Sequence, residues 1–353
     1  MDDLLIDGSQ HSGSGTIVRQ SVALSALTGR PIHVINARAR RDKPGLRLQH
    51  IKVVEAMCDL VNGTADGLTL GSREFIFRPG MLDIRAHHEW DIGSAGSTTM
   101  LAIAILPVLA FSSTAVEVVL HGGLFQDFAP TVHHLQHVLL PLLGRMGLHA
   151  DLEMIRPGYV PRGQGILKLS VTPVSSALRP ITLTRAGPVT RIWGIALASH
   201  LSERRVADRM AVTVTEELKA AGYRPSIDVV YDKSALQRGA ALAVFADLTG
   251  AARVGADGAG APGRTSESIG KTVAQRLLHD LKSGASLDRY TADKIIPFAA
   301  LADGVSRVRI PEVTDHVLSN AWLARLFLEA DVTINNHEMI VNGRGLTRSH
   351  QWR

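Results

Sequence analysis

The chain has 353 residues, of which 45% are hydrophobic, 20% are charged and 32 are glycine. This composition fits a globular α/β protein better than a disordered, fibrous or membrane protein, and the length allows either one large core with an insertion or two domains. The formal net charge of +5 favours a polyanionic partner such as nucleic acid or a nucleotide.

The N-terminus, Met-Asp-Asp-Leu-Leu-Ile-Asp, is acidic and leads directly into a strand-like stretch, unlike a secretory leader with its basic start and apolar middle. The default expectation is therefore a cytoplasmic protein. The longest apolar stretch, Met100 to Phe111, contains a proline and is too short to cross a bilayer, which predicts a buried helix. No membrane segment and no membrane partner are expected.

Two turns rich in glycine and hydroxyl residues each precede a predicted helix. The first, 8–15 (Gly-Ser-Gln-His-Ser-Gly-Ser-Gly), leads into a helix at 17–27, and the second, 93–99 (Gly-Ser-Ala-Gly-Ser-Thr-Thr), opens the apolar helix of 100–111. Backbone N–H groups at such helix starts can hold a phosphate, although a flexible turn or a simple N-cap explains each pattern equally well. The first turn lacks the Gly-Lys-Ser/Thr ending of a Walker A loop.

A basic loop follows the strand predicted at 32–36. It contains five basic residues on either side of a Pro-Gly turn: Arg38, Arg40, Arg41, Lys43 and Arg47. The loop is either a solvated surface or a phosphate-binding one. The helix predicted next, at 48–61, carries the single cysteine, Cys58, which is expected to be a small buried hydrophobe and excludes an internal disulfide or a thiolate zinc cluster.

Short strands and longer helices continue to alternate through the first half. Strands are predicted at 68–70, 74–78, 88–92 and 116–120, and a helix at 132–146, which suggests a repeated α/β architecture. His133 and His137 lie one turn apart on this helix, but without a third ligand a polar helix face is a better interpretation than a metal site.

The sequence pattern changes from about residue 184. Further elements are a helix at 202–221, strands at 226–231 and 240–247, a glycine-rich loop at 250–268 and a helix at 269–281. Residues 184–280 are therefore interpreted as a small inserted α/β domain, and residues 1–183 and 281–353 as the two parts of a large domain.

Two patterns near the C-terminal end can carry chemistry. Tyr290 precedes Asp293 at the start of an apolar run, and Asp315-His316 opens an apolar helix. A tyrosine ring can stack on a base, and a neutral imidazole can attack phosphorus. Ordinary helix starts with an acidic residue in the first turn would give the same patterns.

Taken in order, these segments resemble the RNA 3′-terminal phosphate cyclase family over nearly the whole chain outside 184–280. The matching segments are Ile6-Asp-Gly-Ser-Gln10, 24–31, 38–46, Gln49-His50, 93–99, Gly122-Gly123, Ala129-Pro130, 141–143, 145–147, Gly158-Tyr159 with Pro161, Tyr290, Ala292-Asp293 and His316. The resemblance implies three βαβαββ repeats forming the large domain, with the small domain inserted before the last repeat.

The resemblance also implies an ATP-dependent reaction in which a histidine is adenylylated, AMP passes to an RNA 3′-phosphate end, and a 2′,3′-cyclic phosphate forms. His316 would be the nucleophile, Tyr290 and Pro130 would hold the adenine, and Asp293 would orient the histidine or the nucleotide. Guanidinium and other donor groups suit phosphate oxygens. The residues expected to face phosphates are Arg19, Arg38, Arg41, Gln49 and His50.

The chain departs from the family pattern at four positions. Ser12 stands in place of a metal-binding glutamate, and Thr16, Ile103 and Lys294 each stand in place of a glutamine. ATP is the expected nucleotide and Lys294 is counted among its binding residues. A divalent cation, Mg or Mn, is implied by the family, but the glutamate that would bind it is missing. The loss of this glutamate and the gain of a lysine make the predicted nucleotide pocket more positive by two charges than the family pattern.

Two other interpretations stay open. One is a divergent nucleotidyl-transfer enzyme that activates a non-RNA phosphate or a carboxylate, and the other is a non-catalytic RNA-binding relative. Retention of His316, Tyr290 and Asp293 favours an enzyme, because a protein that only binds RNA does not need them. An enolpyruvyl transferase shares a related repeat architecture but needs no histidine nucleophile.

Overall fold

The computed structural model describes residues 3–250 and 252–348, and its first sheet sets a pattern that recurs. The first repeat consists, in chain order, of β1 (Leu4–Asp7), α1 (Gly15–Thr28), β2 (Ile32–Ile35), α2 (Leu48–Val61), β3 (Thr64–Asp66) and β4 (Phe75–Arg78). β1 and β2 run parallel, and β4 and β3 join them antiparallel, so the strand order is β1-β2-β4-β3. This arrangement is a βαβαββ unit.

The second and third repeats have the same strand order and directions. The second consists of β5 (His87–Asp91), α3 (Thr98–Leu109), β6 (Val116–Gly122), a helical stretch made of α4 (Val132–His134), the π-helical segment η1 (Leu135–Leu139) and α5 (Leu140–Arg145), then β7 (His149–Arg156) and β8 (Gly165–Thr172). The third consists of β9 (Thr182–Leu183), α8 (Arg289–Leu301), β14 (Val305–Arg309), α9 (Asp315–Leu328), β15 (Asp331–Asn335) and β16 (Glu338–Asn342). The prediction of an α/β protein with repeated βαβαββ units is confirmed.

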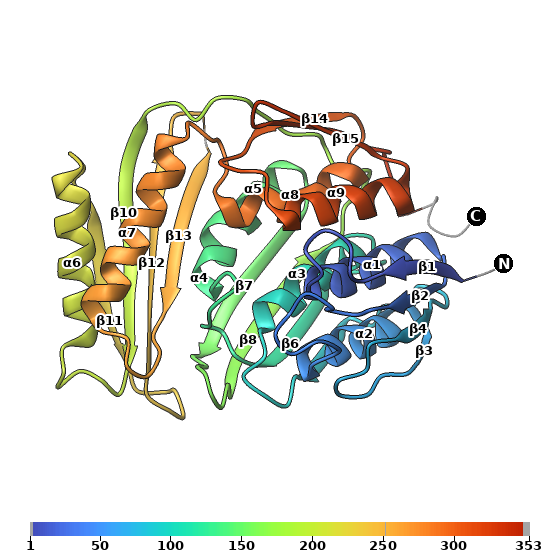
Figure 1. The fold of residues 1–353 in the computed structure, drawn as a ribbon, viewed down its shortest axis with the longest axis horizontal. Coiled ribbons are helices and arrows are strands. Elements are labelled where there is room, and N and C mark those ends of the chain that lie inside the picture. Colours follow the sequence, from blue (N-terminus) through green and yellow to red (C-terminus); the bar gives the residue numbers. More distant parts are fainter. Residues whose placement is uncertain (1–2, 251, 349–353) are drawn as a thin grey trace.

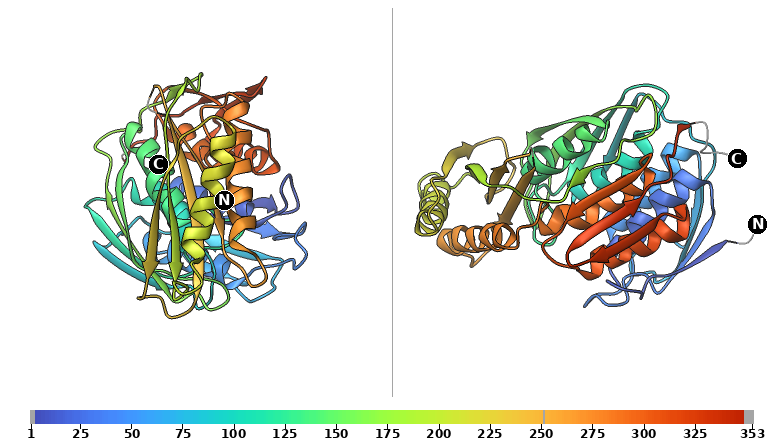
Figure 2. Two further views of the ribbon diagram at one scale, coloured as in Figure 1. Left: turned by 90° about the vertical axis from the view of Figure 1, so that its left-hand side faces the viewer. Right: turned by 90° about the horizontal axis from the view of Figure 1, so that it is seen from above.

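The segment between β9 and α8 forms another sheet at one end of the molecule, with two helices on one of its faces (Figures 1 and 2). Its elements are β10 (Val189–Ser199), α6 (Val206–Ala220), β11 (Ser226–Asp232), β12 (Gly239–Leu248), β13 (Arg253–Ala259) and α7 (Ser266–Lys282). Because β9 already pairs with β14, the insertion lies inside the third repeat, whereas the resemblance implied a position before it. The domain limits at 184 and 280 stay predictions.

Two local predictions were wrong. Within the predicted loop 250–268 the structure has strand β13, which pairs with β12. A Cβ at Gly255 would lie 2.9 Å from Val138 Cγ2, and one at Gly258 would lie 3.1 Å from Val273 Cγ2, so the glycines there permit close packing against helices. The strand predicted at 68–70 is a turn between Gly67 and Gly71, whose φ angles are 80° and 84°.

The helices of the three repeats pack against one another at the centre of the large lobe. α1 contacts α2, α3 and α9, and α8 packs on α9. Fully buried apolar residues such as Ile17, Leu106 and Leu323 fill the interior of this layer. Among the described residues, no helix combines the length and the hydropathy needed to cross a membrane.

The packing of these helices also determines where the site lies. α1, α8 and α9 begin at Gly15, Arg289 and Asp315, and residues from all three helix starts line one pocket. The N-terminus of a helix carries a partial positive charge, which suits an anionic ligand. The fold therefore brings residues from the two ends of the chain to a single anion-favouring opening.

Candidate active site

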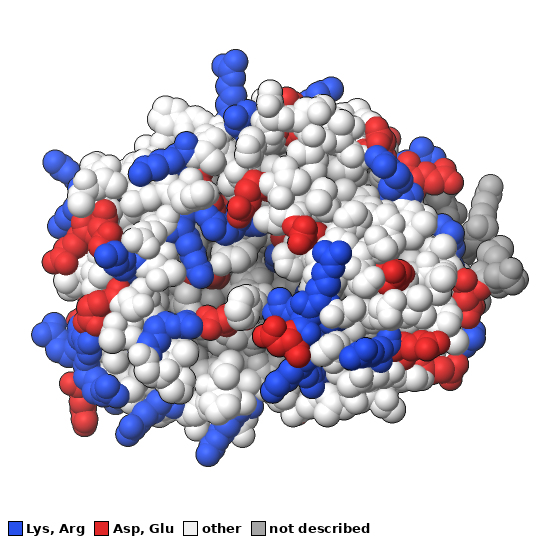
Figure 3. Space-filling model, in the orientation of Figure 1, with Lys and Arg blue, Asp and Glu red and all other residues white. Residues whose placement is uncertain are grey.

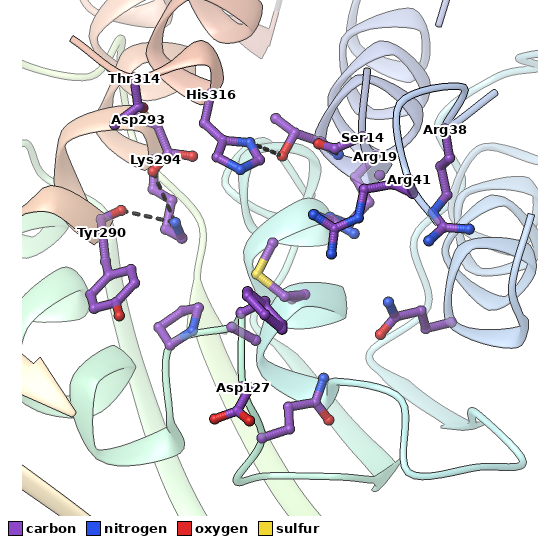
Figure 4. Close-up of a pocket in the computed structure, with 18 of the residues that line it drawn as sticks. Ser14, Arg19, Arg38, Arg41, Asp127, Tyr290, Asp293, Lys294, Thr314 and His316 are labelled. Carbon is purple, nitrogen blue, oxygen red and sulfur yellow. Dashed lines mark hydrogen bonds and ion pairs between the residues drawn. The ribbon is translucent and has the colours of Figure 1, made fainter. Parts of the chain in front are cut away.

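A pocket of about 340 Å³ opens between the starts of α1, α8 and α9, the basic loop and residues 126–130. Figure 4 shows His316 in the middle of this pocket, with Tyr290 on one side and three arginines on the other. All of the site residues expected from the sequence line it: His316, Arg19, Arg38, Arg41, Gln49, His50, Pro130, Tyr290, Asp293 and Lys294. Tertiary structure thus brings together every residue of the predicted set.

His316 lies in the first turn of α9, where Thr314 caps the helix by accepting a hydrogen bond from Val317 N at 3.2 Å. The imidazole Nδ1 is 3.0 Å from Oγ1 of Thr16 on α1. When Nδ1 carries the proton and donates it to Thr16, the Nε2 lone pair is free to act as a nucleophile. A contact between the first and third repeats thus sets the orientation of the ring.

The surroundings of His316 favour the neutral imidazole. The side chain is exposed to the open pocket, but the surrounding protein atoms still remove part of its hydration, and this partial burial lowers the pKa of His316. The nearby charges of Lys294 and Arg19 lower the pKa further, while Asp293 acts in the opposite direction. At neutral pH the ring is therefore available for attack.

Lys294 and Asp293 form an ion pair beside the histidine. Lys294 Nζ donates to Asp293 Oδ1 at 2.9 Å and to the carbonyl oxygen of Tyr290 at 2.9 Å. Asn320 on α9 donates to the carbonyl oxygen of Asp293 at 2.8 Å, which ties the two helices together. The ammonium is thus held at a fixed place in the pocket wall, where it can meet phosphate oxygens.

The arginine side of the pocket carries the positive charge (Figure 4). Burial lowers the pKa of Arg19 to about 10, helped by the charges of Arg38 and Arg41, so the group stays cationic at neutral pH. Arg38 also organises the basic loop, because its Nη1 donates to the carbonyl oxygen of Lys43 at 2.8 Å. Three guanidinium groups at one end of a pocket suit a di- or triphosphate.

His50 completes this side as a neutral donor. Its Nδ1 accepts a hydrogen bond from Arg47 N at 3.2 Å, which leaves the proton of a neutral ring on Nε2. Burial and the charge of Arg19 keep the pKa of His50 well below its usual range. Gly15 lies against the ring, since a Cβ at this position would be only 2.2 Å from Nε2. The glycine at the end of the first glycine-rich turn therefore lets the backbone lie close to the His50 ring.

The second glycine-rich turn supports the site indirectly. Ser97 caps α3 by accepting from Met100 N at 3.1 Å, and Ser97 N donates to the side-chain oxygen of Gln49 at 3.0 Å. Thr99 Oγ1 donates to the carbonyl oxygen of Pro130 at 2.7 Å. The turn therefore positions Gln49 and Pro130, both of which line the pocket.

Tyr290 and Pro130 line the opposite end, away from the arginines. Burial and the charge of Asp257 raise the pKa of Tyr290 to about 12. The ring packs edge-on against His134, with 5.7 Å between centroids, and Asp288 holds the backbone by accepting from Tyr290 N at 3.0 Å. An aromatic face and a pyrrolidine ring at one end of a pocket suit a flat base.

Sequence reasoning missed Phe128, which also lines this pocket. Its side chain is 90% exposed, its φ is 64°, and its ring faces the Arg41 guanidinium at 5.5 Å from the centroid. A bulky residue in the left-handed region is uncommon, and strained residues of this kind cluster at active sites and ligand clamps. Its place just before Ala129-Pro130, a pair matched to the family, was the available signal.

The donor set does not fit a divalent cation held by the protein. Ser12, in place of the family glutamate, is taken up by a hydroxyl network in which Ser319 Oγ on α9 donates to Ser12 Oγ at 2.8 Å. Within residues 3–250 and 252–348, no three His, Cys, Asp or Glu side chains gather in a way that could hold a metal ion. Mg²⁺ in nucleotide sites is usually held by one or two carboxylates together with substrate phosphates and water, so the loss of the glutamate leaves a weaker protein contribution rather than a complete protein site.

The other sequence candidates lie outside the pocket. His133 is buried at the boundary between the repeats and the inserted sheet. Its ring stacks on that of His137, with 6.4 Å between the ring centroids. Cys58 is half-buried on α2, and partial burial raises the pKa of its thiol to about 11, which makes it a poor nucleophile.

Comparison with known proteins gives consistent matches. The family model for RNA 3′-terminal phosphate cyclase matches residues 10–334. Proteins named RNA 3′-terminal phosphate cyclase are similar: one from Caldivirga maquilingensis is 36% identical over 95% of each chain. Relatives with the same name from Pyrococcus abyssi and Methanothermobacter thermautotrophicus are 37% and 39% identical over 92% and 91% of this chain, in each case covering 93% of the relative.

Proposed function

Because the chain belongs to the RNA 3′-terminal phosphate cyclase family, we propose that it uses ATP to convert an RNA 3′-phosphate end into a 2′,3′-cyclic phosphate, with His316 as the nucleophile. The placement of His316 between a base-sized apolar end and an arginine cluster carries this proposal, because ATP bound across the pocket would present its α-phosphorus at the imidazole.

In the first step His316 Nε2 attacks the α-phosphorus of ATP. A P–N bond forms, the bond from the α-phosphorus to the bridging oxygen breaks, and pyrophosphate leaves with its charge matched by Arg19, Arg38 and Arg41. Thr16 Oγ1 keeps the proton on Nδ1 by accepting a hydrogen bond from it. The product is an adenylylated histidine, a phosphoramidate.

Two further transfers complete the reaction. An oxygen of the RNA 3′-phosphate attacks the same phosphorus, the P–N bond breaks and His316 regains its lone pair. The 2′-hydroxyl of the terminal ribose then attacks the activated 3′-phosphate, AMP leaves, and the hydroxyl proton passes to the solvent or to the leaving group. Lys294 and His50 supply donors for the negative charge that builds up at each stage.

Residues of this chain supply the positive charge in each of these steps. Lys294 adds a cation next to His316, where the family has a neutral glutamine, and Ser12 removes an anion. A cation that accompanies ATP would be held mainly by the phosphates and by water, as is usual for Mg²⁺ in nucleotide sites.

Incubation with α-labelled ATP tests the nucleotidyl transfer. We expect label on the wild-type protein that is lost in acid and stable in base, no label on His316→Ala, and full label on His149→Ala, an exposed histidine on β7. Addition of an RNA with a 3′-phosphate should then release the label and give an end that resists phosphatase. Absence of label on the wild type would refute the proposal. Label without a cyclic end would indicate another acceptor.

A further inference from the structure

The pocket at His316 continues into a longer groove between the repeats and the inserted sheet. A second pocket of about 560 Å³ shares Gln49, Gln126 and Asp127 with the first. A further pocket of about 460 Å³ shares Val160 and residues 260–262 with the second. We name this continuous depression, lined from Gln49 through Val160 to Arg238, the interlobe groove.

The groove has arginines at both ends that form no ion pair among the described residues. Arg47 lines the part next to the His316 pocket, and Arg204 and Arg238 line the far part, where the inserted lobe begins α6 and β12. Lys and Arg side chains lie around the hollow on the face of the molecule drawn in Figure 3, interspersed with Asp and Glu side chains. A groove with unpaired cations at its two ends favours an extended polyanion over a small anion.

The carboxylates near the groove are already neutralised. Asp127 forms a two-pronged ion pair with Arg264 at 2.8 and 2.9 Å, and Glu267 forms one with Arg209 at 2.7 and 2.9 Å. Each pair weakens the repulsion that its carboxylate would exert on a phosphate. Each pair also engages its arginine, so Arg264 and Arg209 are not free to bind a phosphate. Arg47, Arg204 and Arg238 are left to meet an incoming anion.

A third pocket next to the His316 pocket does not offer the same path. It is lined by Arg264, Arg276 and Asp257, among others. Arg264 is paired with Asp127, Arg276 donates to the carbonyl oxygen of Asp257 at 3.0 Å, and the Asp257 carboxylate adds a negative charge. A polyanion leaving the His316 pocket is therefore better accommodated in the interlobe groove.

We propose that the interlobe groove holds the RNA strand that precedes the 3′-phosphate, with backbone phosphates on Arg47, Arg204 and Arg238. The inference rests on the proposed function, because an RNA whose 3′-phosphate lies at His316 must leave the pocket by some path. Small residues along the wall, including Gly96, Gly260 and Ala261, leave room for the sugar-phosphate chain, and the exposed side chain of Val160 offers an apolar contact to a base.

The experiment compares two substrates on one enzyme: a dinucleotide with a 3′-phosphate, which ends within the His316 pocket, and a ten-nucleotide RNA with a 3′-phosphate, which fills the groove. For the double variant Arg204→Ala/Arg238→Ala we expect the KM for the long RNA to rise about tenfold. The slope of log KM against log salt concentration should fall by about 1.4, because each phosphate contact on a single strand contributes about 0.7 to that slope. The dinucleotide KM and labelling by ATP should not change, which also shows that the variant is folded.

Two control variants make the result specific. Lys219→Ala/Arg224→Ala removes the same charge at the other end of α6 and should leave both substrates unaffected. Arg204→Lys/Arg238→Lys retains the charge, so the long-RNA KM should rise clearly less than in the double alanine variant.

The possible results distinguish a failure of the groove assignment from a failure of the proposed function. If the wild-type protein cyclises both substrates and the double variant has the wild-type KM for the long RNA, the groove assignment is overturned and the proposed function stands. A loss as large in the control variant would overturn it too, since the effect would then come from net charge alone. Wild type that cyclises neither substrate would refute the proposed function.

Discussion

Thr16 Oγ1 lies 3.0 Å from His316 Nδ1, although the two residues are 300 positions apart in the chain. Thr16 belongs to the first turn of α1 in the first repeat, and His316 to the first turn of α9 in the third. Because this contact leaves Nε2 facing the pocket, it links the packing of the repeats to the direction of nucleophilic attack.

Removal of the Thr16 hydroxyl tests this orientation. We expect Thr16→Val to slow self-adenylylation about tenfold, the loss of roughly one hydrogen bond, with little change in the KM for ATP. Thr16→Ser retains the acceptor and should keep most of the rate. Single-turnover labelling at saturating ATP measures both. An unchanged rate in Thr16→Val would mean that the ring is oriented by other contacts.

Lys294 is expected to set the acid limb of the pH–rate profile. Its charge is one of the influences that lower the pKa of His316, so Lys294→Gln should raise that pKa. Since only the neutral imidazole attacks, the rate should then begin to fall at a higher pH than in the wild type as the solution is made more acidic. Lys294→Arg, which retains a positive charge, should keep the acid limb near its wild-type position.

The rate of adenylylation between about pH 4 and 8 at saturating ATP gives this profile. Lys219→Gln on the exposed end of α6 removes the same charge far from the pocket and should not move the curve. An acid limb of Lys294→Gln that stays in place, or moves to lower pH, would contradict the expected influence of Lys294 on His316.

Phe128 is expected to stack on the terminal base of the RNA. Stacking of a base on an aromatic side chain contributes about 1–3 kcal/mol, so Phe128→Gly should raise the KM for a 3′-phosphorylated dinucleotide by roughly fivefold or more. Phe128→Trp should retain affinity. Self-adenylylation is the control reaction, and a KM for RNA unchanged in Phe128→Gly would show that the exposed ring has no part in binding.

The same variant separates binding from stability. Relief of the left-handed conformation at Phe128 gains about 1–2 kcal/mol, and the greater chain entropy of glycine opposes it by about 0.5–1 kcal/mol. We therefore expect the free energy of unfolding of Phe128→Gly to lie between that of wild type and about 1.5 kcal/mol above it. Denaturant titration checks this value.

Gly15 is expected to tolerate no side chain. A Cβ there would lie 2.2 Å from His50 Nε2 and 2.8 Å from Arg19 Nη1, so Gly15→Ala must displace two groups that face the phosphates. We expect the KM for ATP to rise at least about tenfold, which corresponds to about 1.4 kcal/mol. Gly144→Ala is the matched helical control, because its nearest neighbour would be 4.0 Å away, and it should gain up to about 1 kcal/mol of stability.

The buried pair of His134 and Asp288 is expected to be important for stability. Their side chains are 1% and 0% exposed and lie 3.1 Å apart, and Asp288 also caps α8. Removing one partner of a buried pair costs about 3–5 kcal/mol, so His134→Ala should lower the free energy of unfolding by an amount of that order. His121→Ala, which breaks the partly exposed pair with Glu89, should cost less than about 1 kcal/mol.

The pH dependence of this cost has a defined sign. Burial opposes the charge on His134, but Asp288 outweighs it and raises the pKa of His134, and the same contact lowers the pKa of Asp288. The stability from His134 is complete below its unfolded pKa and is lost as pH rises through its raised folded pKa, whereas that from Asp288 is lost as pH falls. The difference between wild type and His134→Ala should be largest between about pH 4 and 6.5. A difference that grows above about pH 8 would contradict this.

The sequence by itself determined the α/β class and a predicted set of site residues, all of which line the pocket. Periodicity located most helices, because a buried helix needs apolar residues at regular spacing, and the collinear match to a known family identified His316, Tyr290 and the arginines. Prediction from the sequence failed at β13, because glycines such as Gly255 and Gly258 are typical of a loop. In the structure they lie in a strand, where the lack of a side chain permits close packing against helices. Prediction also missed Phe128, because an exposed aromatic next to the matched pair Ala129-Pro130 has the same local pattern as one on an ordinary surface, and only its sequence position pointed to the pocket.

Only the tertiary structure decided how those residues act on one another. The Thr16 contact, the lowered pKa of His316 and the neutral His50 donor depend on helices from different repeats meeting at one place. The position of the insertion after β9 and the interlobe groove depend on strand pairing and lobe packing. Sequence spacing specifies neighbours along one helix or strand, whereas burial, charge and hydrogen bonds between distant segments arise only when the chain is folded.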